Sequence, residues 1–176
     1  MFIRVYSWPK VFVSGIILQV SISRGGLPKT PILSGFLSPL GVDGDGHAHP
    51  QFHGGPSKAV LIISSEVIDS LIAKGFPLFY GALGENFTTR GLNTRDLRPG
   101  DRLRAGGAVV EITTPRVPCY QLDVYGPTIK QEIYDRKVKA LDPSSPRWGM
   151  SGLYASVIQP GPVGPGDPIE LLSALA

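Results

Sequence analysis

Glycine and proline punctuate this chain from end to end. Its 176 residues include 22 glycines and 17 prolines. Proline removes a backbone hydrogen-bond donor and glycine weakens the interior of helices and strands, so regular elements must be short and often interrupted. This punctuation favours strands and turns over long helices.

Runs of β-branched and other apolar residues predict where the strands lie. Such runs occur at 11–22, 60–63, 108–114, 154–158 and 169–172. The segment 160–167 is rich in proline and glycine and is typical of a turn between the last two of these strands. The chain is therefore expected to be mainly β, built as a many-stranded barrel or sandwich.

Two segments depart from this pattern and predict short helices. The segment 65–74 begins behind a serine cap, presents an apolar face and ends at Gly75. The segment 127–140 has Ile129 and Ile133 on its apolar side and basic residues in its later half, as the helix dipole favours. No internal repeat or shift of composition marks a boundary, so we expect one domain over 1–176.

Composition excludes several functional classes. The net charge is +3, and no run of Lys and Arg follows the pattern of a nucleic-acid-binding surface. No stretch of about 18 apolar residues could span a bilayer, so no membrane association is expected. The single cysteine cannot form an internal disulfide, which makes the cytoplasm the expected location and leaves a free thiol to explain.

All three histidines stand in one glycine-rich segment, 41–60, directly before an apolar strand. Glycine allows close approach of the backbone to a ligand, so the segment could line a binding site. The simpler alternative is a solvent-facing loop of polar turns. A third alternative is a zinc site made by His47, His49 and His53.

A second polar segment, 84–92, contains Glu85, Asn86 and Arg90. Glutamate and asparagine can exchange hydrogen bonds with a ligand, and arginine can hold an oxyanion. A polar turn leading into a strand would explain the same residues.

The sole cysteine, Cys119, follows a predicted strand and lies three residues after Arg116. A nearby guanidinium favours the thiolate, the form that binds a soft metal or attacks an electrophile. The alternative is a cysteine that packs as a small buried hydrophobic residue. Prolines on both sides of Val117 argue for an irregular backbone and weaken that alternative.

Taken in order, these segments resemble the MOSC family, named for the C-terminal domain of molybdenum cofactor sulfurases. The similar segments are 25–29, 41–45, 53–60, Glu66, 84–88, 91–92, 99–101, 116–119, 152–154, Gly161 and 166–167. A lone Gly-Glu-Asn or Pro-Cys would say little, but the ordered set with compatible spacing is specific. The resemblance covers about 13–172.

The resemblance implies a closed, MOSC-type β-barrel that binds a pyranopterin molybdenum cofactor. It maps the metal ligand and catalytic residue to Cys119. The other cofactor-binding candidates are His53, Gly54, Gly55, Lys58, Glu85, Asn86, Arg90 and Arg116. Of these, the basic residues are assigned to the cofactor phosphate by their chemistry. In this light His47 and His49 are loop residues rather than zinc ligands.

The resemblance also implies a reductase of N-hydroxylated substrates, such as hydroxylamino-purines or amidoximes. Electrons must then come from a separate donor protein, because the sequence has no dinucleotide fingerprint and no cysteine cluster. A carrier of the cofactor or of sulfur on Cys119, and a cofactor-free interaction domain, are the alternatives. Pyridoxal phosphate as a ligand and a homodimer as the assembly stay open.

Overall fold

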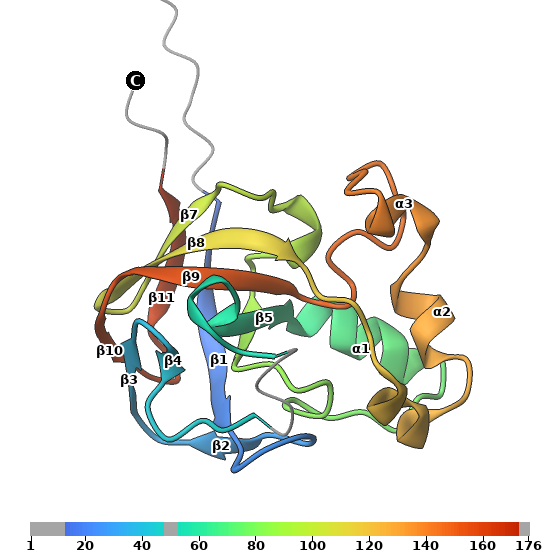
Figure 1. Cartoon of the computed structure of the whole chain (residues 1–176), viewed down its shortest axis with the longest axis horizontal. Coiled ribbons are helices and arrows are strands. Elements are labelled where there is room, and N and C mark those ends of the chain that lie inside the picture. Colours follow the sequence, from blue (N-terminus) through green and yellow to red (C-terminus); the bar gives the residue numbers. More distant parts are fainter. Residues whose placement is uncertain (1–12, 48–52, 173–176) are drawn as a thin grey trace, which may run out of the picture.

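Seven strands close into a barrel in the computed structural model, which describes residues 13–47 and 53–172 (Figure 1). The strands follow the order β11-β7-β8-β9-β5-β6-β1, and a pairing of β1 with β11 closes the ring. Their bounds are β1 (Ser14–Ile22), β5 (Val60–Ser64), β6 (Phe87–Arg90), β7 (Arg102–Ala105), β8 (Ala108–Pro115), β9 (Leu153–Gln159) and β11 (Pro168–Leu172). The predicted closed β-barrel is thus confirmed.

Each of the five predicted strands corresponds to an observed strand, and the ends that can be compared differ by at most one residue. For the first of them, only the part from Val13 onward can be compared, since 11 and 12 lie outside the described residues. The central strand β5 is buried along its whole length, between β9 on one side and β6 on the other. Its unbroken apolar sequence follows from this position, because neither face meets water.

Four short strands lie beside the barrel. They are β2 (Thr30–Ile32), which extends the sheet from β1, and β3 (Gly35–Ser38), β4 (Gly41–Val42) and β10 (Gly161–Val163), which form a small separate sheet. The turn predicted over 160–167 is therefore confirmed only in its later part, since residues 161–163 form β10. Gly161 to Val163 pair with β3, and Gly161 fits there because a side chain would collide with the backbone of Gly107.

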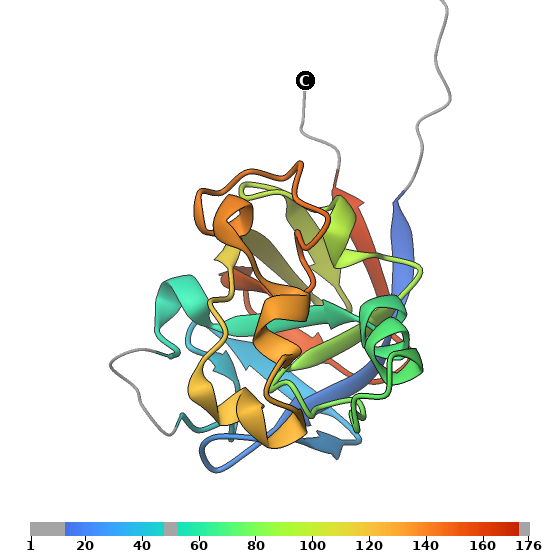
Figure 2. The ribbon, with the colours of Figure 1, turned by 90° about the vertical axis from the view of Figure 1, so that its right-hand side faces the viewer.

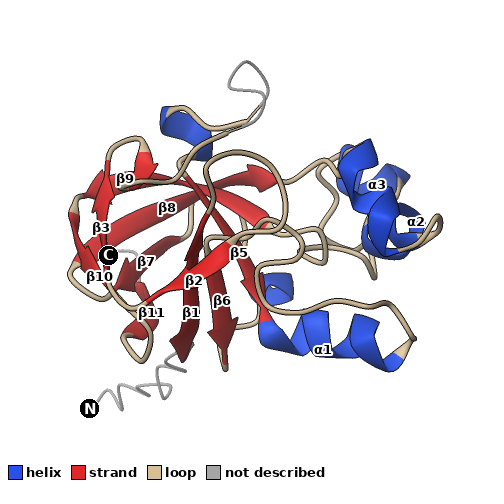
Figure 3. Ribbon diagram, turned by 90° about the horizontal axis from the view of Figure 1, so that it is seen from below, coloured by secondary structure: helices blue, strands red, loops and turns tan. Residues whose placement is uncertain are grey.

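The three α-helices lie together at one end of the barrel, as two perpendicular views show, whereas the 3-10 helix η1 (Pro56–Lys58) lies beside β9 (Figures 1 and 3). The helices of the described residues are α1 (Ser65–Ala73), α2 (Ile129–Ile133), α3 (Arg136–Lys139) and the 3-10 helices η1, η2 (Thr94–Asp96) and η3 (Tyr120–Tyr125). The predicted helix 65–74 is confirmed as α1, although the Ser64 side chain that precedes it makes no capping hydrogen bond. None of the described helices is both long and apolar enough to cross a membrane.

The predicted helix over 127–140 is instead two short helices, visible in front of the barrel in Figure 2. Tyr134 has an extended backbone that ends α2. Asp135 then starts α3, because its side chain accepts a hydrogen bond from the backbone N–H of Val138. An aspartate in this position competes with a continuous helix, which the periodicity of the isoleucines did not reveal.

Two apolar clusters support this arrangement. The barrel interior is filled by side chains from β1, β5, β6, β8 and β9, with Phe87 of β6 among the largest. A second cluster joins α1 to η3 and α2 and includes Ile68, Leu122 and Ile129. This second cluster fixes η3, and with it the segment that carries Cys119, against the end of the barrel.

Candidate cofactor site

Two adjoining cavities meet at Cys119. The inner compartment encloses about 70 Å³, and the outer groove encloses about 540 Å³. Both are lined by His53, Lys58, Cys119, Gln121 and Tyr154. The inner compartment adds Lys29, His47, Gly54, Leu83, Asn86 and Arg116. The outer groove adds Thr114, Pro115, Val117, Pro118 and Tyr120.

Cys119 lies where the chain leaves the barrel. Strand β8 ends at Pro115, and Cys119 is the residue directly before η3. Its thiol is half-buried and free, with Sγ 3.9 Å from Oε1 of Gln121. A thiol that is partly accessible at the junction of two cavities is placed to bind a ligand, whereas the predicted alternative was a cysteine packed in the core.

Arg116 brings a positive charge into the wall of the inner compartment. The side chain is only 4% exposed, and it donates hydrogen bonds to the carbonyl oxygens of Ser151 (Nε, 2.8 Å) and Leu83 (Nη2, 2.7 Å). Burial lowers the pKa of the Arg116 guanidinium, and Tyr154, Cys119 and Glu85 act in the opposite direction. Among the described residues no carboxylate forms a salt bridge with it. A buried cation without a paired anion favours an anionic ligand in the compartment.

A second buried group of charges forms the far wall. Lys29 forms an ion pair with Asp45, and both side chains are almost fully buried. Burial lowers the pKa of Lys29, while the Asp45 carboxylate acts to raise it. The side-chain amide of Asn86 donates to the same carboxylate over 2.8 Å. Asn86 also joins β5 to β1, because its Oδ1 accepts from Leu61 N and its Nδ2 donates to Ser21 O.

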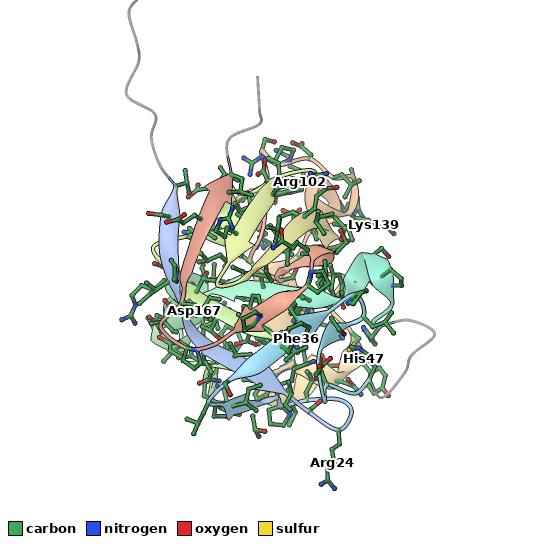
Figure 4. The ribbon with its side chains drawn as sticks, turned by 90° about the vertical axis from the view of Figure 1, so that its left-hand side faces the viewer. Arg24, Phe36, His47, Arg102, Lys139 and Asp167 are labelled. Carbon is green, nitrogen blue, oxygen red and sulfur yellow. The ribbon has the colours of Figure 1, made fainter. Side chains whose placement is uncertain are left out.

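His47 completes this wall next to Gly54. Burial lowers the pKa of His47, and the Lys29 charge lowers it further, while Asp45 acts to raise it. Gly54 has a φ of 83°, and a Cβ at this position would lie 2.6 Å from Nε2 of His47. Glycine is therefore required here for both backbone conformation and close approach. Figure 4 shows His47 on the side of the barrel that carries β3, while the nearby Arg24 projects away from the protein.

Tyr154 links the two compartments from β9. Its hydroxyl lies 3.3 Å from Nδ1 of His53, and Nζ of Lys58 lies 5.6 Å from the centre of its ring. Burial raises the pKa of Tyr154, against the influence of Arg116. The phenol therefore keeps its proton at neutral pH and can act as a hydrogen-bond donor in the site.

Comparison with known proteins shows the family to which this chain belongs. A model of the MOSC domain matches residues 49–170. The chain belongs to the MOSC domain family. It is 33% identical over 145 residues to Protein YiiM of Escherichia coli (strain K12), covering 80% of this chain and 60% of YiiM. It is 34% identical over 153 residues to the uncharacterized protein YflK of Bacillus subtilis (strain 168), covering 84% of this chain and 63% of YflK.

This MOSC chain thus spans less than two thirds of the length of either relative. The crystal structure of YiiM from Escherichia coli superimposes with a TM-score of 0.65 and 26% identity, covering 94% of this chain and 71% of that one. The crystal structure of the YUAD protein from Bacillus subtilis superimposes with a TM-score of 0.68 at 21% identity. The match covers 93% of this chain and 98% of that one, and it supports the fold alone. MOSC domains are associated with the molybdenum cofactor.

Six of the predicted site residues of this MOSC domain line the inner compartment: His53, Gly54, Lys58, Asn86, Arg116 and Cys119. Three do not line either cavity. Gly55 is exposed at the start of η1, and Arg90 is exposed at the end of β6. Glu85 is fully buried behind the wall, where its Oε1 accepts a hydrogen bond from the backbone N–H of Gly81 over 2.6 Å.

The zinc alternative is not supported by the described residues. His47 and His53 both line the inner compartment, but His49 lies outside the residues that the structure describes. Within 13–47 and 53–172, no group of three His, Cys, Asp or Glu side chains is arranged to hold a metal ion.

Sequence reasoning missed four residues of this site: Lys29, Asp45, Gln121 and Tyr154. Lys29, Asp45 and Tyr154 stand in segments that carried the family resemblance, so a signal was present at each. Their spacing in the sequence, however, does not show that Lys29, Gln121 and Tyr154 line one cavity, or that Asp45 forms an ion pair with Lys29 beside it. The fold supplies that information.

Proposed function

We propose that this protein binds a pyranopterin molybdenum cofactor through Cys119 and reduces N-hydroxylated substrates. The observation that carries the proposal is a half-buried free thiol, at the junction of two cavities, close to a buried guanidinium that forms no salt bridge with any described carboxylate. Its membership of the MOSC domain family supports the same conclusion.

The chemistry of the lining residues fits this cofactor. A thiolate is a soft ligand of the kind that suits molybdenum in a sulfur-rich environment. Arg116, Lys29 and Lys58 place positive charge around the inner compartment, where an anionic phosphate or metal centre would be favoured. The inner compartment opens into the outer groove through the residues that line both, so the two cavities form one continuous site around Cys119.

When bound, the cofactor supplies two-electron redox chemistry at its metal. The overall reaction cleaves the N–O bond of the substrate and consumes two electrons and two protons, giving the reduced nitrogen compound and water. Tyr154 holds a proton on its hydroxyl, 3.3 Å from His53, and this pair can orient the substrate oxygen by hydrogen bonding. Arg116 stays charged throughout and stabilises negative charge at the site.

The two electrons require a separate donor protein. The chain has one cysteine, which is too few to hold an iron–sulfur cluster. A small redox protein or flavoprotein that docks beside the outer groove would supply them. This partner follows from the stoichiometry of the proposed reaction.

Turnover tests the proposal directly. Cofactor-loaded protein and an artificial electron donor should reduce a hydroxylamino-purine, and Cys119→Ala should abolish this activity. Val124→Ala is the matched control, because Val124 is 75% exposed on η3 and lines neither cavity. Bound molybdenum without turnover of any N-hydroxylated compound would instead indicate a carrier of the cofactor. Absence of both molybdenum and pterin would contradict cofactor binding altogether.

A further inference from the structure

The outer groove differs from the inner compartment in its chemistry. Its volume of about 540 Å³ lies within the range of pockets that bind small organic molecules. The residues that only the outer groove contributes are a threonine, two prolines, a valine and a tyrosine. The described lining residues of this groove include no carboxylate, and its cation is Lys58 at the junction.

Two large side chains of this groove are exposed on either side of Cys119. Val117 is 63% exposed and Tyr120 is 69% exposed. The backbone at both positions is restricted. Pro118 limits the conformation of Val117, and Tyr120 lies in the first turn of η3, where Cys119 O accepts a hydrogen bond from Leu122 N. The exposed aromatic ring of Tyr120, next to Cys119, would gain free energy by covering the flat face of a ligand.

The charged residues are distributed so that the two cavities favour different ligands. Arg116 and Lys29 belong to the inner compartment alone, so an anionic cofactor gains most by placing its charged groups there. The outer groove is then left for the body of the substrate. Its apolar and aromatic lining favours a ligand with little charge, and Lys58 disfavours a cationic one.

We propose that the outer groove is the substrate site and that Tyr120 is its specificity-determining residue, selecting N-hydroxylated compounds with an uncharged, planar aromatic body. This inference rests on the proposed function. Tyr120 covers the face of the aromatic body, while Val117 and Pro118 add apolar surface. The N–OH group of the substrate is thereby directed toward Cys119, at the junction of the cavities.

A matched pair of substrates tests the role of Tyr120. Benzamidoxime and acetamidoxime carry the same reacting group, but only the first has an aromatic ring. In cofactor-loaded protein with an artificial donor, Tyr120→Ala should lower kcat/KM for benzamidoxime about three- to tenfold. It should change kcat/KM for acetamidoxime less than about twofold. Tyr120→Phe should keep the wild-type preference, and Val124→Ala on the same 3-10 helix is the control. An equal loss for both substrates would overturn the inference.

A binding measurement separates this inference from the proposed function. Without any electron donor, ligand-observed NMR on the purified protein should show tighter binding of benzamidoxime than of acetamidoxime, and Tyr120→Ala should remove about the same three- to tenfold difference. If the wild type turns over neither amidoxime but shows this preference, the reductase proposal fails and the groove assignment holds. If wild type and Tyr120→Ala bind benzamidoxime equally, the groove assignment is wrong whether or not turnover occurs.

Discussion

Arg116 and Cys119 lie three residues apart, but the structure holds them in different ways. Arg116 is fixed by two carbonyl oxygens in the protein interior, whereas Cys119 stands at the edge of a groove. The sequence pattern indicated both residues, because an arginine near a lone cysteine is chemically distinctive. It did not indicate that the guanidinium would be buried with no salt bridge to a described carboxylate, since burial depends on the segments before β9 and before β6, which contact it.

The buried carboxyl group of Glu85 makes the stability of the protein depend on pH. Burial raises its pKa, against hydrogen bonds from Gly81 and Thr88 and the charge of Arg116, and its Oε2 has no hydrogen-bond partner. The folded state therefore keeps the proton to higher pH than the unfolded chain does. Stability contributed by Glu85 falls as pH rises from about 4, its unfolded pKa, through the raised pKa of the folded state.

Glu85→Gln should remove this dependence. Relative to wild type, the variant should gain free energy of unfolding as pH rises from 4 to 8, as measured by urea denaturation at each pH. Glu170→Gln, at an exposed position of β11, is the control and should follow the wild type. A constant difference between Glu85→Gln and wild type over this range would show that Glu85 does not titrate in this way.

Short elements were predicted less well than long ones. Strands β5, β8 and β9 have extended apolar runs that identify them, whereas β2, β4 and β10 have two or three residues each and no periodicity to detect. The break between α2 and α3 depends on the capping side chain of Asp135, which outweighs the helical spacing of the residues around it. The tertiary partner of Asp135, the hydroxyl of Ser145, lies ten residues away and could not be inferred from local pattern.

Replacement of Asp135 tests whether its side chain stabilises the start of α3. Asp135→Ala removes the acceptor for Val138 N (2.8 Å) and for the Ser145 hydroxyl (2.7 Å), so α3 should fray and the melting temperature should fall. Asp135→Asn should keep most of the stability, because asparagine also caps helices. Equal melting temperatures for wild type and Asp135→Ala, measured by circular dichroism, would mean that the cap does not support α3.

Closure of the barrel is a property of the whole molecule. It joins β1 to β11, at opposite ends of the described chain, with Gly15 opposite Ile169. The turn-rich composition predicted a mainly β fold, but it could not specify which strands pair, since partners such as these are more than 150 residues apart. For the same reason the sequence identified separate site segments without showing that they share one cavity.

Gly15→Ala should therefore weaken the entire fold. A Cβ at this position would lie 2.5 Å from Leu92 N and even closer to the carbonyl oxygen of Arg90, so the backbone must shift where β1 meets β6. We expect a loss of about 1–3 kcal/mol in the free energy of unfolding by urea titration. Gly164→Ala is the control, because the nearest atom to its Cβ would be 3.6 Å away. An equal effect of both substitutions would contradict the importance of this close contact between β1 and the end of β6.

The account as a whole depends on Cys119 as the metal ligand. Wild type and Cys119→Ala should be produced in a host that makes the cofactor, and molybdenum and pterin should be measured per chain by elemental analysis and fluorescence. We predict about one molybdenum per chain in the wild type and loss of most of it in Cys119→Ala, because the thiolate is the protein's soft ligand. Equal molybdenum content in wild type and Cys119→Ala would contradict the central claim.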